Sequence, residues 1–100
     1  MTGRGTAPPL ANATLVRGRF PRSARPGEVM KRVDHHGNVT HYQTYAADGL
    51  PSKRVDLVGA PHGAVSTPHV VGYTRHTNPT TGETFVRAEP PRPAHPDELP

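Results

Sequence analysis

Short strand-like segments separated by turn residues make up most of the chain after residue 27. Val29 and Val33 alternate with polar residues, and residues 39–45 are rich in Thr, Tyr and Val, which favour a pleated surface. Further segments of this kind are residues 53–58, 69–74 and 84–87. The 13 prolines and 10 glycines argue against long helices, because each weakens a helix interior. We therefore predict a mainly β domain (α+β being the alternative), with a small antiparallel sheet of four to five strands, long Pro/Gly-rich loops and little helix.

Turn residues punctuate these predicted strands. Residues 35–38 (HHGN) and 48–51 (DGLP) suit tight loops, because Gly and Asn tolerate a positive φ. Residues 59–68 (GAPHGAVSTP) predict a longer loop, and residues 78–82 (NPTTG) a further turn. Proline followed by two acidic residues predicts a short helical turn over residues 96–99.

The predicted strand at residues 53–58 (KRVDLV) has two different faces. Val55 and Leu57 alternate with Arg54 and Asp56, and successive side chains of a strand point to opposite sides. We therefore expect Arg54 and Asp56 to lie side by side on the face away from the core.

Residues 1–27 differ from the rest in composition. They contain five arginines, four prolines and no acidic residue, and such a segment buries too little surface to offset its ordering entropy. We expect a basic flexible lead or linker over residues 1–27 and a folded domain over residues 28–100. Residues 15–20 (LVRGRF) could add an edge strand.

The charge of the chain indicates an anionic partner. The net charge is +4, with Lys+Arg 12 against Asp+Glu 8, and most of the cations are arginines, whose planar guanidinium grips phosphate. RNA, DNA, an acidic membrane or an acidic protein would suit it, although the charge could equally serve solubility alone. The absence of cysteine excludes disulfides and thiolate ligands. No apolar run approaches the ~20 residues that span a membrane, so we expect no membrane-spanning segment.

Seven histidines carry the candidate chemistry. RNA cleavage without a metal needs a base for the ribose 2′-hydroxyl and an acid for the departing 5′-oxygen, and histidine can serve as either. His62 and His69 are the best placed, because a rigid Pro/Gly loop can present them to a ligand, with Thr67 beside them. They could also be surface histidines without a role. His41 could be a third participant, and the remaining four are weaker candidates: His35, His36, His76 and His95.

Other chemistries have less support in the sequence. His35, His36 and His41 could supply three zinc ligands, but no familiar spacing supports such a site, so we expect no metal and no cofactor. The sequence contains no nucleophile elbow, phosphate-binding glycine loop or HExxH helix.

Several short motifs in the last seventy residues resemble those of polymorphic toxin type 24, a C-terminal toxin domain. They are Arg54-Val55-Asp56, Pro61-His62-Gly63, Thr67-Pro68-His69-Val70, Tyr73, Asn78-Pro79, Thr81-Gly82-Glu83, Arg92-Pro93-Ala94 and Glu98-Leu99-Pro100. Tyr42, Tyr45, Gly49 and Pro51 fit the same pattern more loosely. Val71 departs from it, because a second histidine would be expected there; a chain without that histidine would be weakened or would use another ring.

The resemblance implies a metal-independent ribonuclease, similar to barnase-like and EndoU-like toxins, in which a β-sheet carries the active site. Such domains are the delivered tips of larger secreted bacterial proteins that act in the cytoplasm of a target cell, each paired with a cognate immunity protein. We expect a monomer, inhibited by an acidic immunity protein covering the region of His62 and His69. Carried onto this sequence, the catalytic residues are His62 and His69 as acid and base, Arg54 on the phosphate, Thr67 as a donor, and Asp56 as an orienting group. The RNA-binding residues are Lys53, Tyr73, Arg75 and Arg87, with Tyr73 stacking on a base or packing in the core.

Two further interpretations stay open. A basic module that binds RNA or another polyanion without cutting it would lose affinity steeply with salt but give no product. A structural fragment of a larger protein would show neither tight RNA binding nor toxicity.

Overall fold

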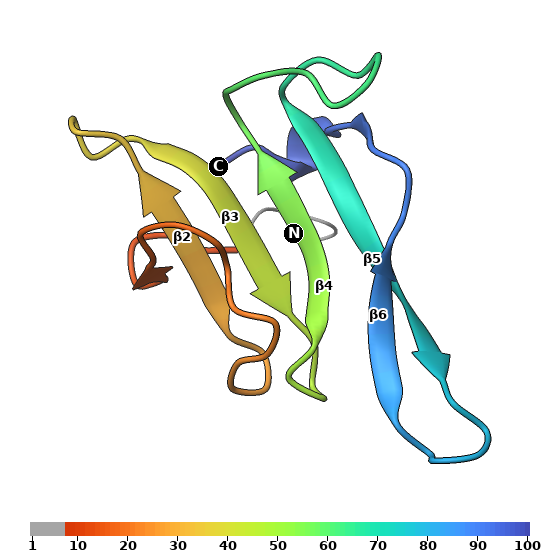
Figure 1. The fold of residues 1–100 in the computed structure, drawn as a ribbon. Helices are drawn as coiled ribbons and strands as arrows, with labels where there is room; N and C mark the ends of the chain where they lie inside the picture. The colour runs from red at the N-terminus through yellow and green to blue at the C-terminus, as the bar shows by residue number, and fades with distance from the viewer. Residues whose placement is uncertain (1–7) are drawn as a thin grey trace.

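The computed structural model describes residues 8–100, which form one mixed β-sheet of seven strands (Figure 1). The strands are β1 (Thr14–Leu15), β2 (Val29–Val33), β3 (Val39–Tyr45), β4 (Pro51–Asp56), β5 (His69–Thr77), β6 (Thr84–Ala88) and β7 (Arg92–Pro93). The order across the sheet is β1-β2-β3-β4-β5-β6, and β7 pairs with the first two residues of β5, at the edge opposite β4. The helix content of the described residues is a single 3₁₀ turn, η1 (Pro96–Glu98). The predicted mainly β fold and the helical turn near residue 96 are confirmed.

The sheet differs from the prediction in three ways. It has seven strands instead of four to five, because the short β1 and β7 add to the predicted set. The possible edge strand at residues 15–20 overlaps β1 at Leu15 alone. The pairing of β1 with β2 is parallel, whereas all other pairs are antiparallel. The strand expected at 53–58 begins earlier, at Pro51, since a proline is tolerated as the first residue of a strand.

Strand β5 is longer than the sequence indicates. Instead of a short segment over residues 69–74 it covers nine residues, His69–Thr77. Its second half pairs only with β6, from Tyr73 opposite Ala88 to Thr77 opposite Thr84. This exposed hairpin extends beyond the other strands (Figure 1), and the pairing within it was not visible in the hydrophobic pattern.

The segment before β2 packs against the sheet. Leu10 is 9% exposed and belongs to the core cluster, and its carbonyl oxygen accepts a hydrogen bond from Lys31 Nζ at 2.7 Å. Thr14 and Leu15 pair with Met30 and Lys31. The domain boundary after residue 27 stays a prediction, and residues 1–7 of the predicted lead lie outside the described part of the chain.

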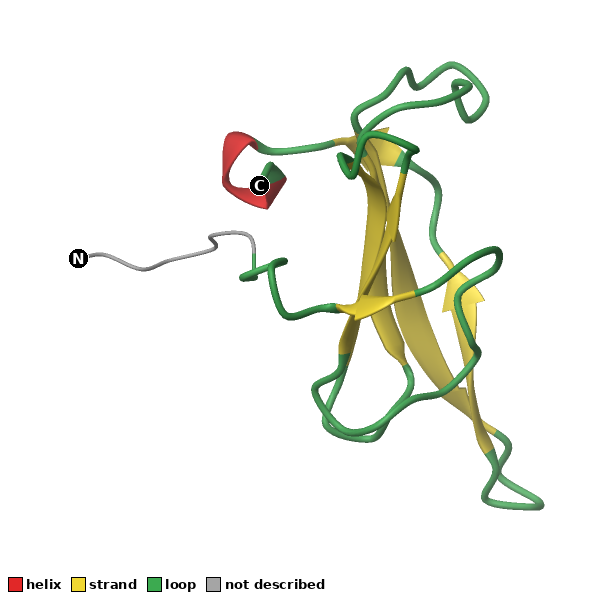
Figure 2. Cartoon of the chain, turned by 90° about the vertical axis from the view of Figure 1, so that its left-hand side faces the viewer, coloured by secondary structure: helices red, strands yellow, loops and turns green. Residues whose placement is uncertain are grey.

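One face of the sheet carries the hydrophobic core. Tyr42, Val55 and Val70 are completely buried there and contact Leu10. The C-terminal turn η1 lies on this side of the sheet (Figure 2), where Tyr42 Oη donates to the carbonyl oxygen of Glu98 at 2.6 Å. Burial and the neighbouring Glu98 raise the pKa of Tyr42 to about 12, so this phenol keeps its proton.

Charged contacts fix the C-terminal turn on the core face. The Glu98 side chain is 5% exposed and accepts hydrogen bonds from Arg92 and from Lys53, the latter at 2.7 Å. The backbone N–H of His95 donates to the same carboxylate. These donors, Arg92 first, hold the pKa of Glu98 well below its usual range, against the opposing effect of burial. The buried carboxylate therefore ties the end of the chain to β4 and to β7.

Candidate functional site

The face of the sheet opposite the core carries a row of polar side chains across four strands. The register places Arg32 of β2 opposite His41 of β3, His41 opposite Asp56 of β4, and Asp56 opposite His69 of β5. Directly paired residues share one face of a sheet. We call these four residues the polar row. A second row beside it contains Gln43, Arg54 and Val71, paired in the same manner.

Asp56 is the hub of the polar row. Its Oδ1 accepts a hydrogen bond from Arg54 Nε at 2.9 Å, and its Oδ2 accepts from Arg54 Nη2 at 3.1 Å. Oδ2 also lies 2.8 Å from His69 Nε2. Burial raises the pKa of Asp56, but the donors and charge of Arg54, with the His69 contact, more than offset this and lower the pKa overall. Asp56 is thus an ionised, fully engaged carboxylate, which suits it to orient its neighbours.

His41 presents an unprotonated ring nitrogen. Its Nδ1 lies 2.8 Å from Thr40 Oγ1, and Thr40 Oγ1 donates its only proton to the carbonyl oxygen of Arg32 at 3.3 Å. The Thr40 oxygen must therefore accept from His41 Nδ1–H, which leaves the lone pair on Nε2. Burial lowers the pKa of His41 and the positive charge of Arg32 lowers it further, while Asp56 acts in the opposite direction. His41 is consequently neutral at neutral pH, as a general base must be.

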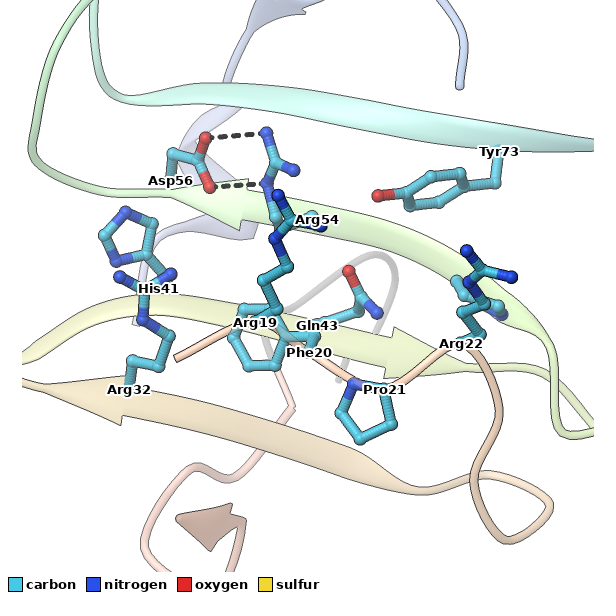
Figure 3. A pocket seen from close by; sticks show the side chains of 11 residues that line it. Arg19, Phe20, Pro21, Arg22, Arg32, His41, Gln43, Arg54, Asp56 and Tyr73 are labelled. Carbon is cyan, nitrogen blue, oxygen red and sulfur yellow. Dashed lines mark hydrogen bonds and ion pairs between the residues drawn. The ribbon is translucent and has the colours of Figure 1, made fainter. Parts of the chain in front are cut away.

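A cavity of about 460 Å³ opens over this face of the sheet (Figure 3). Its volume lies in the range typical of ligand sites, roughly 300–1,000 Å³. The lining is mostly polar and cationic, with Asp56 as its single acidic side chain. The lining residues are Arg19, Phe20, Pro21, Arg22, Arg32, His41, Gln43, Pro51, Arg54, Asp56 and Tyr73.

Strands β2 to β5 form the floor of the cavity, and the β1–β2 connection (residues 16–28) forms one wall. Tyr45 Oη donates to the carbonyl oxygen of Pro21 at 2.6 Å, which fixes the connection over the sheet. Gln43 Nε2 in turn donates to Tyr45 Oη at 3.0 Å. The guanidinium of Arg32 lies 6.0 Å from the centre of the Phe20 ring, within the range of a cation–π contact.

Four of the candidate functional residues named from the sequence line the cavity: His41, Arg54, Asp56 and Tyr73. The predicted side-by-side arrangement of Arg54 and Asp56 on the non-core face is confirmed by their paired hydrogen bonds. Tyr73 is half-buried rather than part of the core, and its hydroxyl is directed toward Arg54 (Figure 3).

The two histidines expected to act as a pair occupy different environments. The His69 side chain is 2% exposed and lies beside Asp56 on β5, outside the cavity lining. His62 is exposed in the loop between β4 and β5, with its ring centre 6.0 Å from that of His69. Thr67 in the same loop has its Oγ1 3.4 Å from the carbonyl oxygen of Gly59. Of His41, His62 and His69, His41 alone lines the cavity.

The remaining predicted RNA contacts lie elsewhere. Lys53 is on the core face and bonds Glu98. Arg75 makes two hydrogen bonds of 2.8 Å to Asp48, and Arg87 lies over the Phe85 ring on the exposed hairpin. These side chains are separate from the cavity.

Five further lining residues were not predicted from the sequence: Arg19, Phe20, Arg22, Arg32 and Gln43. Arg32 and Gln43 belong to alternating positions on the same face as His41, so the period-2 pattern of β2 and β3 contained a signal for them. The β1–β2 connection gave no such signal, because its composition indicated a free linker.

Val71, where the resemblance leads us to expect histidine, lies on this same face. It is 2% exposed and pairs with Arg54. The expected histidine would therefore adjoin the Arg54 guanidinium. In this chain the imidazole among the cavity-lining residues is that of His41, two strands away.

One cluster of potential metal ligands occurs in the described residues, at His95, Asp97 and Glu98, whose ligand atoms lie within 4.8 Å of one another. Glu98 already accepts from Arg92 and Lys53, so the cluster is accounted for by the ion pairs that hold the C-terminal turn. Over residues 8–100, no helix has the length and apolar character needed to cross a membrane.

Comparison with known proteins gives one family. No curated protein and no solved structure matches the chain. The sequence model of a family described as Bacterial toxin 24 matches residues 13–100, which include the wall and the floor of the cavity. Since this match covers most of the sequence, the chain belongs to the bacterial toxin 24 family.

Proposed function

We propose that this bacterial toxin domain is a metal-independent endoribonuclease that cleaves RNA by transesterification and leaves a 2′,3′-cyclic phosphate. The observation that carries the proposal is an imidazole, that of His41, in a cavity lined by four arginines, and the lowered pKa of this histidine favours its neutral form. Arginine side chains recognise phosphate, and a neutral imidazole can remove the proton of a ribose hydroxyl.

His41 acts as the general base. Its Nε2 lone pair takes the proton from the 2′-hydroxyl, and the 2′-oxygen then forms a bond to the adjacent phosphorus. The Nδ1–H contact with Thr40 fixes both the tautomer and the ring orientation.

Arg54 and Arg32 stabilise the negative charge that builds up on the phosphorane. Arg54 uses two of its five N–H groups on Asp56, which leaves three for the neighbouring Tyr73 hydroxyl and for a phosphate oxygen. A guanidinium held in place by a buried carboxylate loses little entropy when it binds the transition state. Arg32 lies beside His41 on β2 and faces the same cavity.

Tyr73 supplies the proton of the leaving group. Of the lining side chains that can exchange a proton, His41 serves as the base and Asp56 is ionised, which leaves the Tyr73 hydroxyl as the donor. The bond from phosphorus to the 5′-oxygen breaks as this oxygen takes the phenolic proton. Exchange with water then returns His41 and Tyr73 to their starting states.

His69 is a positioning residue in this scheme. Its ring bonds Asp56, which holds Arg54, so its effect on the reaction passes through two other side chains. The sequence-based pairing of His62 with His69 as acid and base stays a prediction, and the variants described below test it against the His41 scheme.

The toxin identity also supports a delivery route and an inhibitor. We propose that the domain is carried by a larger bacterial protein into the cytoplasm of a target cell, and that a cognate acidic immunity protein neutralises it. An inhibitor of this kind would cover the cationic cavity, because this is the direct way to exclude RNA. A complex of toxin and immunity protein that leaves Arg54 and His41 accessible would contradict this placement.

The test is incubation of the purified chain with total RNA in EDTA, beside His41→Ala and a control, His76→Ala. His76 lies on the exposed β5–β6 hairpin, away from the cavity. We expect products that end in 2′,3′-cyclic phosphate from the parent and the control but not from His41→Ala. Intact RNA from folded parent protein would overturn the proposal and favour a polyanion-binding module, whose binding would persist and weaken steeply with salt.

A further inference from the structure

We infer that Arg19 and Arg22 extend the phosphate-binding row of the cavity, so that it binds a single RNA strand through the scissile phosphate and a neighbouring one. This inference rests on the proposed ribonuclease function and deepens it, because it names the form of the substrate. It assigns a binding role to the β1–β2 connection.

The first argument is the absence of partners for these two cations. Among residues 8–100, the guanidiniums of Arg19 and Arg22 make no hydrogen bond and no ion pair. Other arginines of the domain do have carboxylate partners: Arg54 with Asp56, Arg75 with Asp48 and Arg92 with Glu98. Four further arginines among residues 8–100 also have no carboxylate partner: Arg17, Arg25, Arg32 and Arg87. Arg19 and Arg22, like Arg32, border the cavity, so their charge is available to an anion that enters it.

The second argument is their spacing along the cavity. In the view of Figure 3, the Arg19 side chain overlaps Arg54 at the middle of the cavity, whereas Arg22 lies toward the Tyr73 end. A row of cations suits the regularly repeated phosphates of an extended strand, whereas a single phosphate would need one convergent cluster. Phe20, between the two arginines in sequence, supplies an aromatic surface in the same wall.

The third argument is that the connection is held in position before any ligand binds. Tyr45 Oη holds the Pro21 carbonyl, and the N–H of Ala24 donates to the carbonyl oxygen of Gly49 at 2.9 Å. Gly49 has a φ of +79°, and a Cβ there would lie 2.6 Å from the Ala24 oxygen. The turn between β3 and β4 thus needs glycine at this position in order to receive the connection. A prepositioned wall reduces the entropy lost on binding.

The kinetic test compares a ribodinucleoside monophosphate with the same dinucleotide carrying an extra terminal phosphate, at the 5′ end or at the 3′ end. For the parent we expect one of the two extra phosphates to lower KM about tenfold, equivalent to ~1.4 kcal/mol. In Arg19→Ala/Arg22→Ala this ratio of KM values should fall to about one. Arg25→Ala is the matched control, because it lies in the same connection but does not line the cavity. A parent-like ratio in the double variant would overturn the inference.

A binding test separates this inference from the proposed function. Affinity for a non-cleavable 2′-O-methyl oligonucleotide is measured by fluorescence anisotropy over a range of salt concentrations. In Arg19→Ala/Arg22→Ala, the loss of two phosphate contacts should reduce the magnitude of the slope of log K against log salt concentration by about 1.4, since each contact on a single strand contributes ~0.7 to this slope. Arg19→Lys/Arg22→Lys should restore most of the slope, which a merely structural role would not predict. If RNA is never cut but the slope changes in this way, the ribonuclease proposal fails and the phosphate site stands. An unchanged slope in the alanine variant overturns the phosphate site.

Discussion

The Nε2 atom of His69 lies 2.8 Å from Oδ2 of Asp56, in a position where the imidazole is 2% exposed. Because the lowered pKa of Asp56 keeps this carboxylate ionised, Nε2 carries the proton and donates it. The other nitrogen, Nδ1, is buried and has no partner among the described residues. A buried polar atom without a partner lowers the free energy of unfolding by about 1–3 kcal/mol. The chain therefore keeps the His69–Asp56 contact although the other nitrogen of the same ring destabilises the fold. This is consistent with a role of His69 in holding the site together.

The first prediction separates positioning from proton transfer at this contact. We expect His69→Ala to lower kcat by about 10–100-fold, as loss of a supporting group does, while the pH dependence of the remaining activity keeps its acidic limb. Rates of cleavage of a short RNA between pH 4.5 and 8 give both quantities. If His69→Ala and His62→Ala each abolish that limb, the two histidines are the acid–base pair indicated by the sequence.

The parts of the fold that were predicted are those with strong local signals. Val55 and Leu57 alternate with Arg54 and Asp56, so the two faces of β4 followed from a period of two. The proline and acidic residues at 96–98 likewise indicated the C-terminal turn. The length of β5 was underestimated because its residues after Tyr73 pair only with β6. The hydrophobic pattern of one segment does not show which other segment it will pair with.

The site was only partly predictable for a similar reason. Arg54 and Asp56 are two residues apart, so local geometry placed them together. His41 and Asp56 meet through the β3–β4 register, and the sequence does not state which residues of two strands face each other. The wall formed by Arg19 and Arg22 could not be foreseen, because hydrogen bonds from Tyr45 and to Gly49 hold a segment whose composition resembles a linker.

The second prediction concerns the proposed base. His41→Ala should lower kcat/KM by about 10²–10⁴-fold, the usual contribution of a general base, with little change in thermal unfolding. Single-turnover cleavage of a labelled oligonucleotide measures the loss. The control is His76→Ala, which removes an exposed imidazole that stacks on Phe85 away from the cavity. A His41→Ala enzyme that retains more than half of the parent rate would remove His41 from the mechanism.

The third prediction follows from the pKa of His41. Burial and the charge of Arg32 lower this pKa from its ordinary value of 6.5, so a rate that needs the neutral ring should reach its plateau at a correspondingly lower pH. Arg32→Ala removes a positive charge that disfavours protonation, and the pKa of His41 should rise. The acidic limb of kcat/KM should therefore move to higher pH in Arg32→Ala, and Arg25→Ala should leave it in place. A limb that stays fixed in Arg32→Ala would show that another group titrates.

The fourth prediction concerns stability and the buried carboxylate at the end of the chain. Glu98→Gln keeps the shape of the side chain but removes the charge that Lys53 and Arg92 share, and we expect a loss of about 1–3 kcal/mol in the free energy of unfolding at pH 7. Because the pKa of Glu98 is lower in the folded chain than its ordinary value of 4.5, its contribution is present above that pH and is lost as the pH falls below it.

The difference between the parent and Glu98→Gln should accordingly shrink in urea unfolding curves as the pH is lowered from 7 toward 3. Glu83→Gln is the matched control, because Glu83 lies exposed at the tip of the β5–β6 hairpin and should give nearly the parent value throughout. A constant difference at every pH would mean that the substitution acts through packing rather than through charge. A Glu98→Gln protein as stable as the parent at pH 7 would show that the C-terminal turn is held mainly by Tyr42 and the backbone, since the hydrogen bond from Tyr42 Oη to the Glu98 carbonyl survives the substitution.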